Sequence, residues 1–129
     1  MGRANPLYGR SVLVVEDEPL IALDVHRTLR AAGASVLAAT SLNDALELIS
    51  YAEISAAILD VRLHGDDCTY ACRALAKRNI PFVFHTGYSA ADLVKQWGRV
   101  PLITKPARPE GIVSAVTKLL APDTALLRP

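Results

Sequence analysis

Short apolar runs alternate with amphipathic stretches along the whole chain, and this alternation constrains the fold more than any other feature. Five runs have the length and composition of β-strands, at residues 11–15, 35–39, 56–60, 81–85 and 101–104. Each is followed by a stretch with helical spacing of apolar residues. Because parallel strands need crossover connections, usually helices, the pattern predicts an α/β domain whose parallel sheet has helices on both faces.

The first strand and helix are the clearest of these units. Residues 11–15 are apolar throughout, as in a strand buried on both faces. Pro19 suits the first turn of a helix, and apolar residues recur every four positions from Ile21 to Leu29. Gly33 then predicts the end of this helix.

The later helices carry their own signals. Ser41 with Asp44 resembles a capping box at the start of the second helix. Cys68 and Cys72 lie four residues apart on the apolar stripe of the third, so we expect buried, reduced thiols. A short fourth helix is predicted at residues 90–97, and its Trp97 suits either the core or an exposed contact face.

Charge and hydropathy exclude several classes of protein. Fourteen basic and thirteen acidic residues give a formal charge of +1, and no run of Lys or Arg indicates binding to nucleic acid or to a membrane. Residues 1–10 lack the apolar core of a signal peptide, and no stretch has the eighteen apolar residues of a membrane span. We therefore expect a cytoplasmic protein with an extension at 1–10, one domain at 11–120 and a tail at 121–129.

Polar side chains follow four of the predicted strands. They are Glu16 and Asp17 after the first strand, Asp60 at the end of the third, Thr86 after the fourth and Lys105 after the fifth. In an open α/β sheet, ligands bind beyond the carboxyl ends of the strands. The sequence therefore predicts three carboxylates, one hydroxyl and one ammonium at one edge of the sheet.

These groups suit metal-assisted phosphoryl transfer. A hard divalent cation relieves the repulsion between clustered carboxylates, and Mg²⁺ is the natural candidate, with Asp17 and Asp60 as direct ligands and Glu16 acting through water. Asp60 is then the nucleophile. Lys105 would neutralise phosphoryl oxygens and Thr86 would donate a hydrogen bond to them.

Each of these residues also has an ordinary structural interpretation. Glu16 and Asp17 could interact favourably with a helix dipole, and Asp60 could be a turn residue. Thr86 could be a plain strand residue and Lys105 a solvated charge. Those interpretations do not predict that all five residues fall at strand ends, so we favour the functional one.

The same residues resemble the receiver domains of two-component signalling, from residue 11 to about residue 120. The matching segments are Val14-Val15-Glu16-Asp17-Glu18, Leu59-Asp60-Val61-Arg62-Leu63, Thr86-Gly87 and Thr104-Lys105-Pro106. The resemblance implies a flavodoxin-like (βα)5 fold with strand order 2-1-3-4-5, and a cis Lys105-Pro106 bond. It also implies that Asp60 accepts phosphate from a histidine kinase or a phosphotransfer protein.

The resemblance further assigns roles around Asp60. The acidic pair Glu16 and Asp17 would bind Mg²⁺, and the backbone carbonyl of Arg62 would complete the metal site. Thr86 and Lys105 would recognise the phosphoryl group. Such a domain is a signalling domain rather than an enzyme, apart from its self-catalysed phosphotransfer and dephosphorylation.

A narrower resemblance lies in residues 80–88, which are similar to the Phe-x-Thr-Gly-x-Tyr subgroup associated with histidine kinases of the HWE class. Here Tyr88 directly follows Gly87. Leu102 stands where most receivers have an aromatic that reports phosphorylation, so we expect the segment from Gly87 to Gly98 to respond instead. We expect a monomer or a weak homodimer through the face formed by the fourth helix, fifth strand and fifth helix.

Three other functions fit less well. A haloacid-dehalogenase phosphatase, like a nuclease with an Asp-x-Asp motif, needs a second Asp two residues after the first, where this chain has Arg62. A receiver-like module that works without phosphorylation would have lost Asp60 or Lys105. With no output segment in the sequence, a stand-alone regulator, a phosphate shuttle and a hybrid-kinase receiver all remain open. For His64 and His85 we expect structural or solvent roles.

Overall fold

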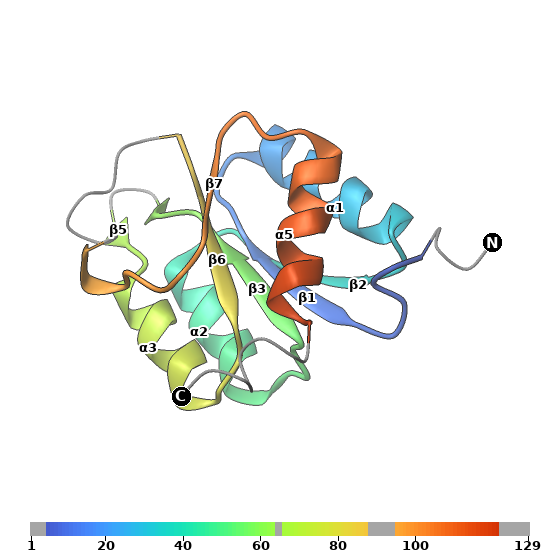
Figure 1. Ribbon diagram of the computed structural model, residues 1–129. Helices are drawn as coiled ribbons and strands as arrows, with labels where there is room; N and C mark the ends of the chain where they lie inside the picture. The colour runs from blue at the N-terminus through green and yellow to red at the C-terminus, as the bar shows by residue number, and fades with distance from the viewer. Residues whose placement is uncertain (1–4, 64–65, 88–94, 122–129) are drawn as a thin grey trace.

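Five strands form one parallel sheet in the computed structural model, which describes residues 5–63, 66–87 and 95–121. They are β1 (Ser11–Val15), β2 (Ser35–Ala39), β3 (Ala56–Leu59), β6 (Phe82–Thr86) and β7 (Leu102–Thr104). The spatial order is β2-β1-β3-β6-β7, and all four neighbouring pairs are parallel. Counted in chain order, this is 2-1-3-4-5, so the flavodoxin-like topology expected from the sequence is confirmed (Figure 1).

Helices cover both faces of the sheet. The helices α1 (Pro19–Ala31) and α5 (Pro109–Leu119) pack on one face, and α2 (Leu42–Tyr51) and α3 (Thr69–Lys77) on the other (Figure 1). Successive strand residues point to opposite faces, so Leu13 packs with α2 and α3 while Val12 packs with α1 and α5. Because both faces are buried, the strands are apolar throughout rather than alternating.

The local helix signals act as the sequence predicts. Ser41 Oγ accepts a hydrogen bond from the backbone N–H of Asp44 at 3.1 Å, which caps α2. Gly33 lies two residues beyond α1 with φ +101°, a conformation that favours glycine. A Cβ at Gly33 would also lie 3.0 Å from Asn5 Cβ and from the backbone nitrogen of Tyr8.

Residues 5–10 pack against the domain. Leu7 is only 1% exposed and joins the core between the sheet, α1 and α5. Its backbone N–H donates to the carbonyl of Ala32 at 2.8 Å, just after α1. The described part of the extension therefore contributes a core side chain.

Several details differ from the expectation. The third strand ends at Leu59 rather than residue 60, and the fourth begins at Phe82, because Pro81 has no N–H for the ladder. The loop after Asp60 contains a short antiparallel pair, β4 (Arg62–Leu63) with β5 (Asp66–Asp67), in addition to the five strands predicted from the sequence. Such a pair depends on backbone contacts between its two arms, which residue types alone do not predict.

Other expectations meet the structure in part. The predicted helix at 90–97 falls largely on residues 88–94, and the tail largely on 122–129, outside the described residues. Trp97 is partly buried and packs edge-to-face on Phe82, with ring centroids 5.9 Å apart, so it lies against the core while part of its surface stays exposed. Cys68 and Cys72 are buried and are not joined in a disulfide, as expected. Among the described helices, none has the length and apolar character needed to cross a membrane.

Candidate functional site

The carboxyl edge of the sheet gathers the five polar residues singled out in the sequence. Glu16 and Asp17 directly follow β1 and Asp60 directly follows β3, the neighbouring strand. Thr86 ends β6 and Lys105 directly follows β7. The backbone N–H of Asp60 still donates to the carbonyl of Val15 at 2.9 Å, so ladder-like hydrogen bonding holds the first two strand ends together.

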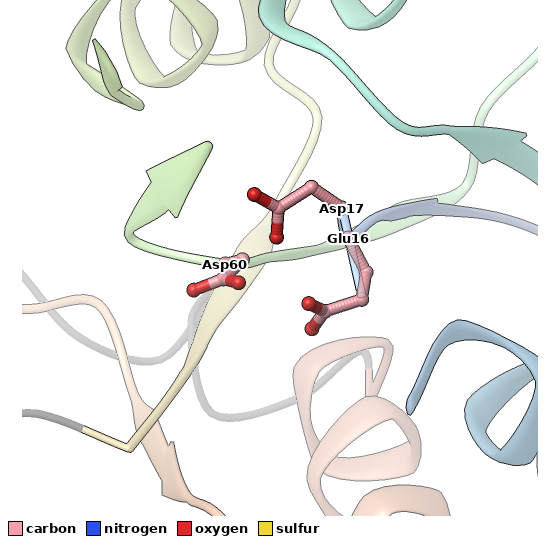
Figure 2. A group of neighbouring side chains, drawn as sticks. All are labelled: Glu16, Asp17 and Asp60. Carbon is pink, nitrogen blue, oxygen red and sulfur yellow. The ribbon is translucent and has the colours of Figure 1, made fainter. Parts of the chain in front are cut away.

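Three carboxylates form one cluster at this edge. One oxygen from each of Glu16, Asp17 and Asp60 lies within 4.8 Å of the others. Figure 2 shows the three side chains gathered where β1 and β3 end. Asp60 is buried, and its Oδ1 accepts a hydrogen bond from the backbone N–H of Arg62 at 3.3 Å. That contact restrains the carboxylate, while the Arg62 side chain is exposed.

Lys105 bridges two of these carboxylates. Its Nζ lies 2.9 Å from Glu16 Oε1 and 3.1 Å from Asp60 Oδ2. Burial lowers the pKa of Lys105, but Glu16 and Asp60 outweigh that effect and raise the pKa above its ordinary value. Lys105 is therefore a fixed positive charge beside Asp60.

The backbone around Lys105 is also constrained. Its N–H donates to the carbonyl of Thr86 at 2.9 Å, which joins the ends of β6 and β7. The Lys105-Pro106 peptide bond is cis, as expected from the sequence. Thr86 itself is only 1% exposed, at the same edge as Lys105.

The Glu16 carboxyl group has a raised pKa. Burial raises its pKa to about 7; the Lys105 ammonium opposes the rise, and Asp60 adds to it. Its Oε2 accepts a hydrogen bond from the backbone N–H of Glu18 at 3.1 Å. A carboxylate whose ionised form is disfavoured in this way gains stability from an added cation.

The donor set fits a hard divalent cation. Three clustered carboxylates face one ammonium, so the fully ionised cluster keeps a negative charge. Oxygen donors of this kind suit Mg²⁺, which is usually held by one or two carboxylates and several waters. The residues present therefore fit the metal that the sequence predicts.

His85 is a member of the site region to which the sequence assigned no chemical role. It precedes Thr86 on β6 and is 4% exposed. Burial lowers its pKa, the charge of Lys105 lowers it further, and Asp60 partly opposes both effects. Because its preceding neighbours along the strand are apolar, His85 resembles an ordinary strand residue in the sequence. His64 lies outside the described residues.

Comparisons with known proteins show which family and which solved structures the chain is similar to. The profile of the family described as "Response regulator receiver domain" matches residues 12–117. The chain is 30% identical over 118 residues to the transcriptional regulatory protein PdtaR of Mycobacterium tuberculosis, a match that covers 88% of this chain and 58% of PdtaR. The chain thus spans less than two thirds of that relative.

Solved structures show the same fold. The chain is similar to a response regulator receiver protein from Sinorhizobium medicae, with a TM-score of 0.79, 28% identity and coverage of 86% of this chain and 94% of that one. It is also similar to the response regulator PhyR from Brucella abortus, with a TM-score of 0.78 and 26% identity. The second match covers 92% of this chain and 51% of PhyR.

Proposed function

The chain belongs to the response regulator receiver domains, and we propose that Asp60 accepts a phosphoryl group in a Mg²⁺-dependent reaction. The donor would be a phosphohistidine of a histidine kinase or of a phosphotransfer protein. Receiver domains are signalling domains, so the product is a conformational signal rather than a released metabolite. The lifetime of that signal would depend on self-catalysed loss of the phosphoryl group.

The phosphoryl group would reach Asp60 in one displacement and leave it in a second. An Asp60 oxygen attacks phosphorus, the bond from phosphorus to the donor imidazole breaks, and the imidazole leaves. Later, water attacks the aspartyl phosphate, inorganic phosphate leaves and the carboxylate returns. Lys105 neutralises oxygens of the phosphoryl group and Thr86 donates a hydrogen bond to it, since phosphoryl transfer depends on positioning and charge.

Four groups would hold the metal. They are the carboxylates of Glu16, Asp17 and Asp60 and the backbone carbonyl of Arg62. Bound Mg²⁺ would supply positive charge for the phosphoryl oxygens. The observation that carries the proposal is that Lys105 Nζ lies 3.1 Å from Asp60 Oδ2, beside two further carboxylates. The proposed nucleophile, the proposed metal ligands and a cation therefore lie together, which supports the proposal.

The direct test is modification of the purified chain. With Mg²⁺ and acetyl phosphate, intact-mass spectrometry should show one phosphoryl group on the wild type and none on Asp60→Asn. Glu47→Gln is the matched control, because Glu47 is an exposed acid of α2. An unchanged adduct on the Asn variant would exclude Asp60 as the acceptor.

The finer identity of the partners is also proposed. The Phe84-His85-Thr86-Gly87 segment, which resembles the Phe-x-Thr-Gly-x-Tyr subgroup, supports a kinase of the HWE class. We expect a cytoplasmic monomer or a weak homodimer through a face that includes β7 and α5, where Leu102 is 45% exposed. Measuring phosphotransfer from purified HWE-class kinases, and sedimentation velocity with and without beryllofluoride, would test both points.

A further inference from the structure

His85 lies on the same side of the sheet as Lys105. In the β6–β7 register, His85 pairs with Ile103, and Lys105 follows two residues later along the chain. Residues two apart on a strand share a face, and Ile103 packs with the core under α1 and α5. His85 and Lys105 therefore both approach the α1 and α5 side of the sheet edge.

A cavity of about 320 Å³ connects these two side chains. His85 and Lys105 both line it, together with apolar side chains of α1 and α5 that include Ile21, Val25 and Ile112. The side chains of Lys105 and His85 therefore border the same space. Asp24 is the acid on its lining, and it is exposed.

The Nε2 atom of His85 is buried and has no hydrogen-bond partner among the described residues. Burial and the nearby ammonium lower the pKa of the imidazole, which favours its neutral form, and Asp60 partly opposes them. A neutral imidazole has one nitrogen that can accept a hydrogen bond. Buried polar atoms without partners are rare in proteins, and a functional role in another state is one reason to keep them.

Lys105 has three N–H donors and would need new partners once phosphorylation begins. In this structure, Glu16 and Asp60 occupy it at 2.9 Å and 3.1 Å. Because the carboxylates of Glu16 and Asp60 would also hold Mg²⁺, the metal would compete with the ammonium for both of them. A phosphoryl oxygen would replace one of these contacts and leave the other unfilled.

We propose that His85 is a positioning residue, whose Nε2 accepts a hydrogen bond from Lys105 in the phosphorylated state and holds the ammonium against the phosphoryl group. The inference rests on the proposed function, since it needs a phosphoryl group on Asp60. It gives the unpartnered nitrogen its partner in the active state. The resting domain carries a polar atom that is unsatisfied until activation.

This role predicts opposite effects on stability and on activation. In His85→Leu, an apolar side chain replaces the buried nitrogen, so the metal-free domain should melt at the same temperature or higher. Its affinity for beryllofluoride with Mg²⁺ should fall about tenfold, which corresponds to about 1.4 kcal/mol. His85→Gln keeps an acceptor oxygen and should remain within about threefold of the wild type.

Val83→Ala is the matched control, because Val83 precedes His85 by two residues on the same face and has no polar atom. It should lower the melting temperature and leave beryllofluoride affinity unchanged. Wild-type affinity in His85→Leu would overturn the inference, as would losses of affinity that simply follow melting temperature across the variants. A wild type that fails to bind beryllofluoride would overturn the proposed function, and this inference with it.

Discussion

The ammonium of Lys105 lies 2.9 Å from a carboxylate oxygen of Glu16, a side chain that is 2% exposed at the end of β1. The two residues are 89 positions apart in the sequence, and the contact joins the β7 and β1 ends of the site. The same ammonium reaches Asp60, so one cation neutralises part of two buried acids. The stability of the resting domain should therefore depend on the ionisation of this cluster.

The first prediction concerns pH. The pKa of Glu16 is raised from 4.5 to about 7, so the folded state binds its proton more tightly than the unfolded state does. The stability that comes from this tighter proton binding is fully present below pH 4.5 and is lost as pH rises through 7. Without divalent metal, the free energy of unfolding should fall by roughly 1–3 kcal/mol between pH 5 and pH 8. Urea denaturation should show a smaller fall in Glu16→Gln, and an equal fall would contradict the assignment.

The second prediction concerns Mg²⁺. Metal that binds only the folded state stabilises it by about 2.7 kcal/mol at one hundred times its dissociation constant. Mg²⁺ at pH 8 should therefore raise the melting temperature of the wild type, and Asp17→Asn should reduce the rise. Glu53→Gln changes an acid that follows α2 and is not part of the cluster. This variant should keep the full rise in melting temperature with Mg²⁺. Equal Mg²⁺ effects in both variants would place the metal elsewhere.

The third prediction concerns Lys105 itself. Lys105→Met removes the cation between Glu16 and Asp60, and removing one partner of a buried pair costs about 3–5 kcal/mol when the pair is fully desolvated. Lys105 is partly exposed, so we expect the free energy of unfolding to fall by about 1–3 kcal/mol at pH 8. The loss should shrink at pH 5, where Glu16 is protonated. Lys118→Met on α5 is the exposed control, and equal losses for the two variants would argue against the pairing.

The fourth prediction concerns Leu7. Truncating this buried side chain to Ala should lower the free energy of unfolding by about 2–4 kcal/mol, because the core would lose apolar contacts and gain a cavity. The neighbouring Tyr8 is 81% exposed, and Tyr8→Ala should change stability by less than about 0.5 kcal/mol. Similar values for the two variants in chemical denaturation would show that residues 5–10 do not hold the core.

The fifth prediction concerns the two thiols. Cys68 and Cys72 are fully buried, with their sulfur atoms 3.8 Å apart at the start of α3. Because alkylation needs an exposed thiolate, both should react slowly in the native protein and rapidly in denaturant. Mass spectrometry after timed iodoacetamide treatment measures this directly. Rapid native labelling of both thiols would mean that α3 opens easily.

The sequence by itself determined the architecture. Local patterns mark the apolar runs that become β1, β3 and β6 and the helices between them. A parallel sheet with right-handed crossover connections is the arrangement that buries these runs. The carboxyl ends of parallel strands meet at one edge, so residues that are distant in the chain were predicted to meet there. The helix end at Gly33 and the helix cap at Ser41 could also be predicted, because both depend on residues close together in the sequence.

Only the tertiary structure decided which side chains are buried and what they face. Leu7 belongs to a segment that looked like an extension, yet it fills the core. The sequence left the position of Trp97 open and assigned His85 no chemical role. In the structure, Trp97 packs on Phe82, and His85 lines the same cavity as Lys105. Burial, pKa and hydrogen-bond partners depend on the register of strands and on the elements packed against them, and no local pattern encodes either.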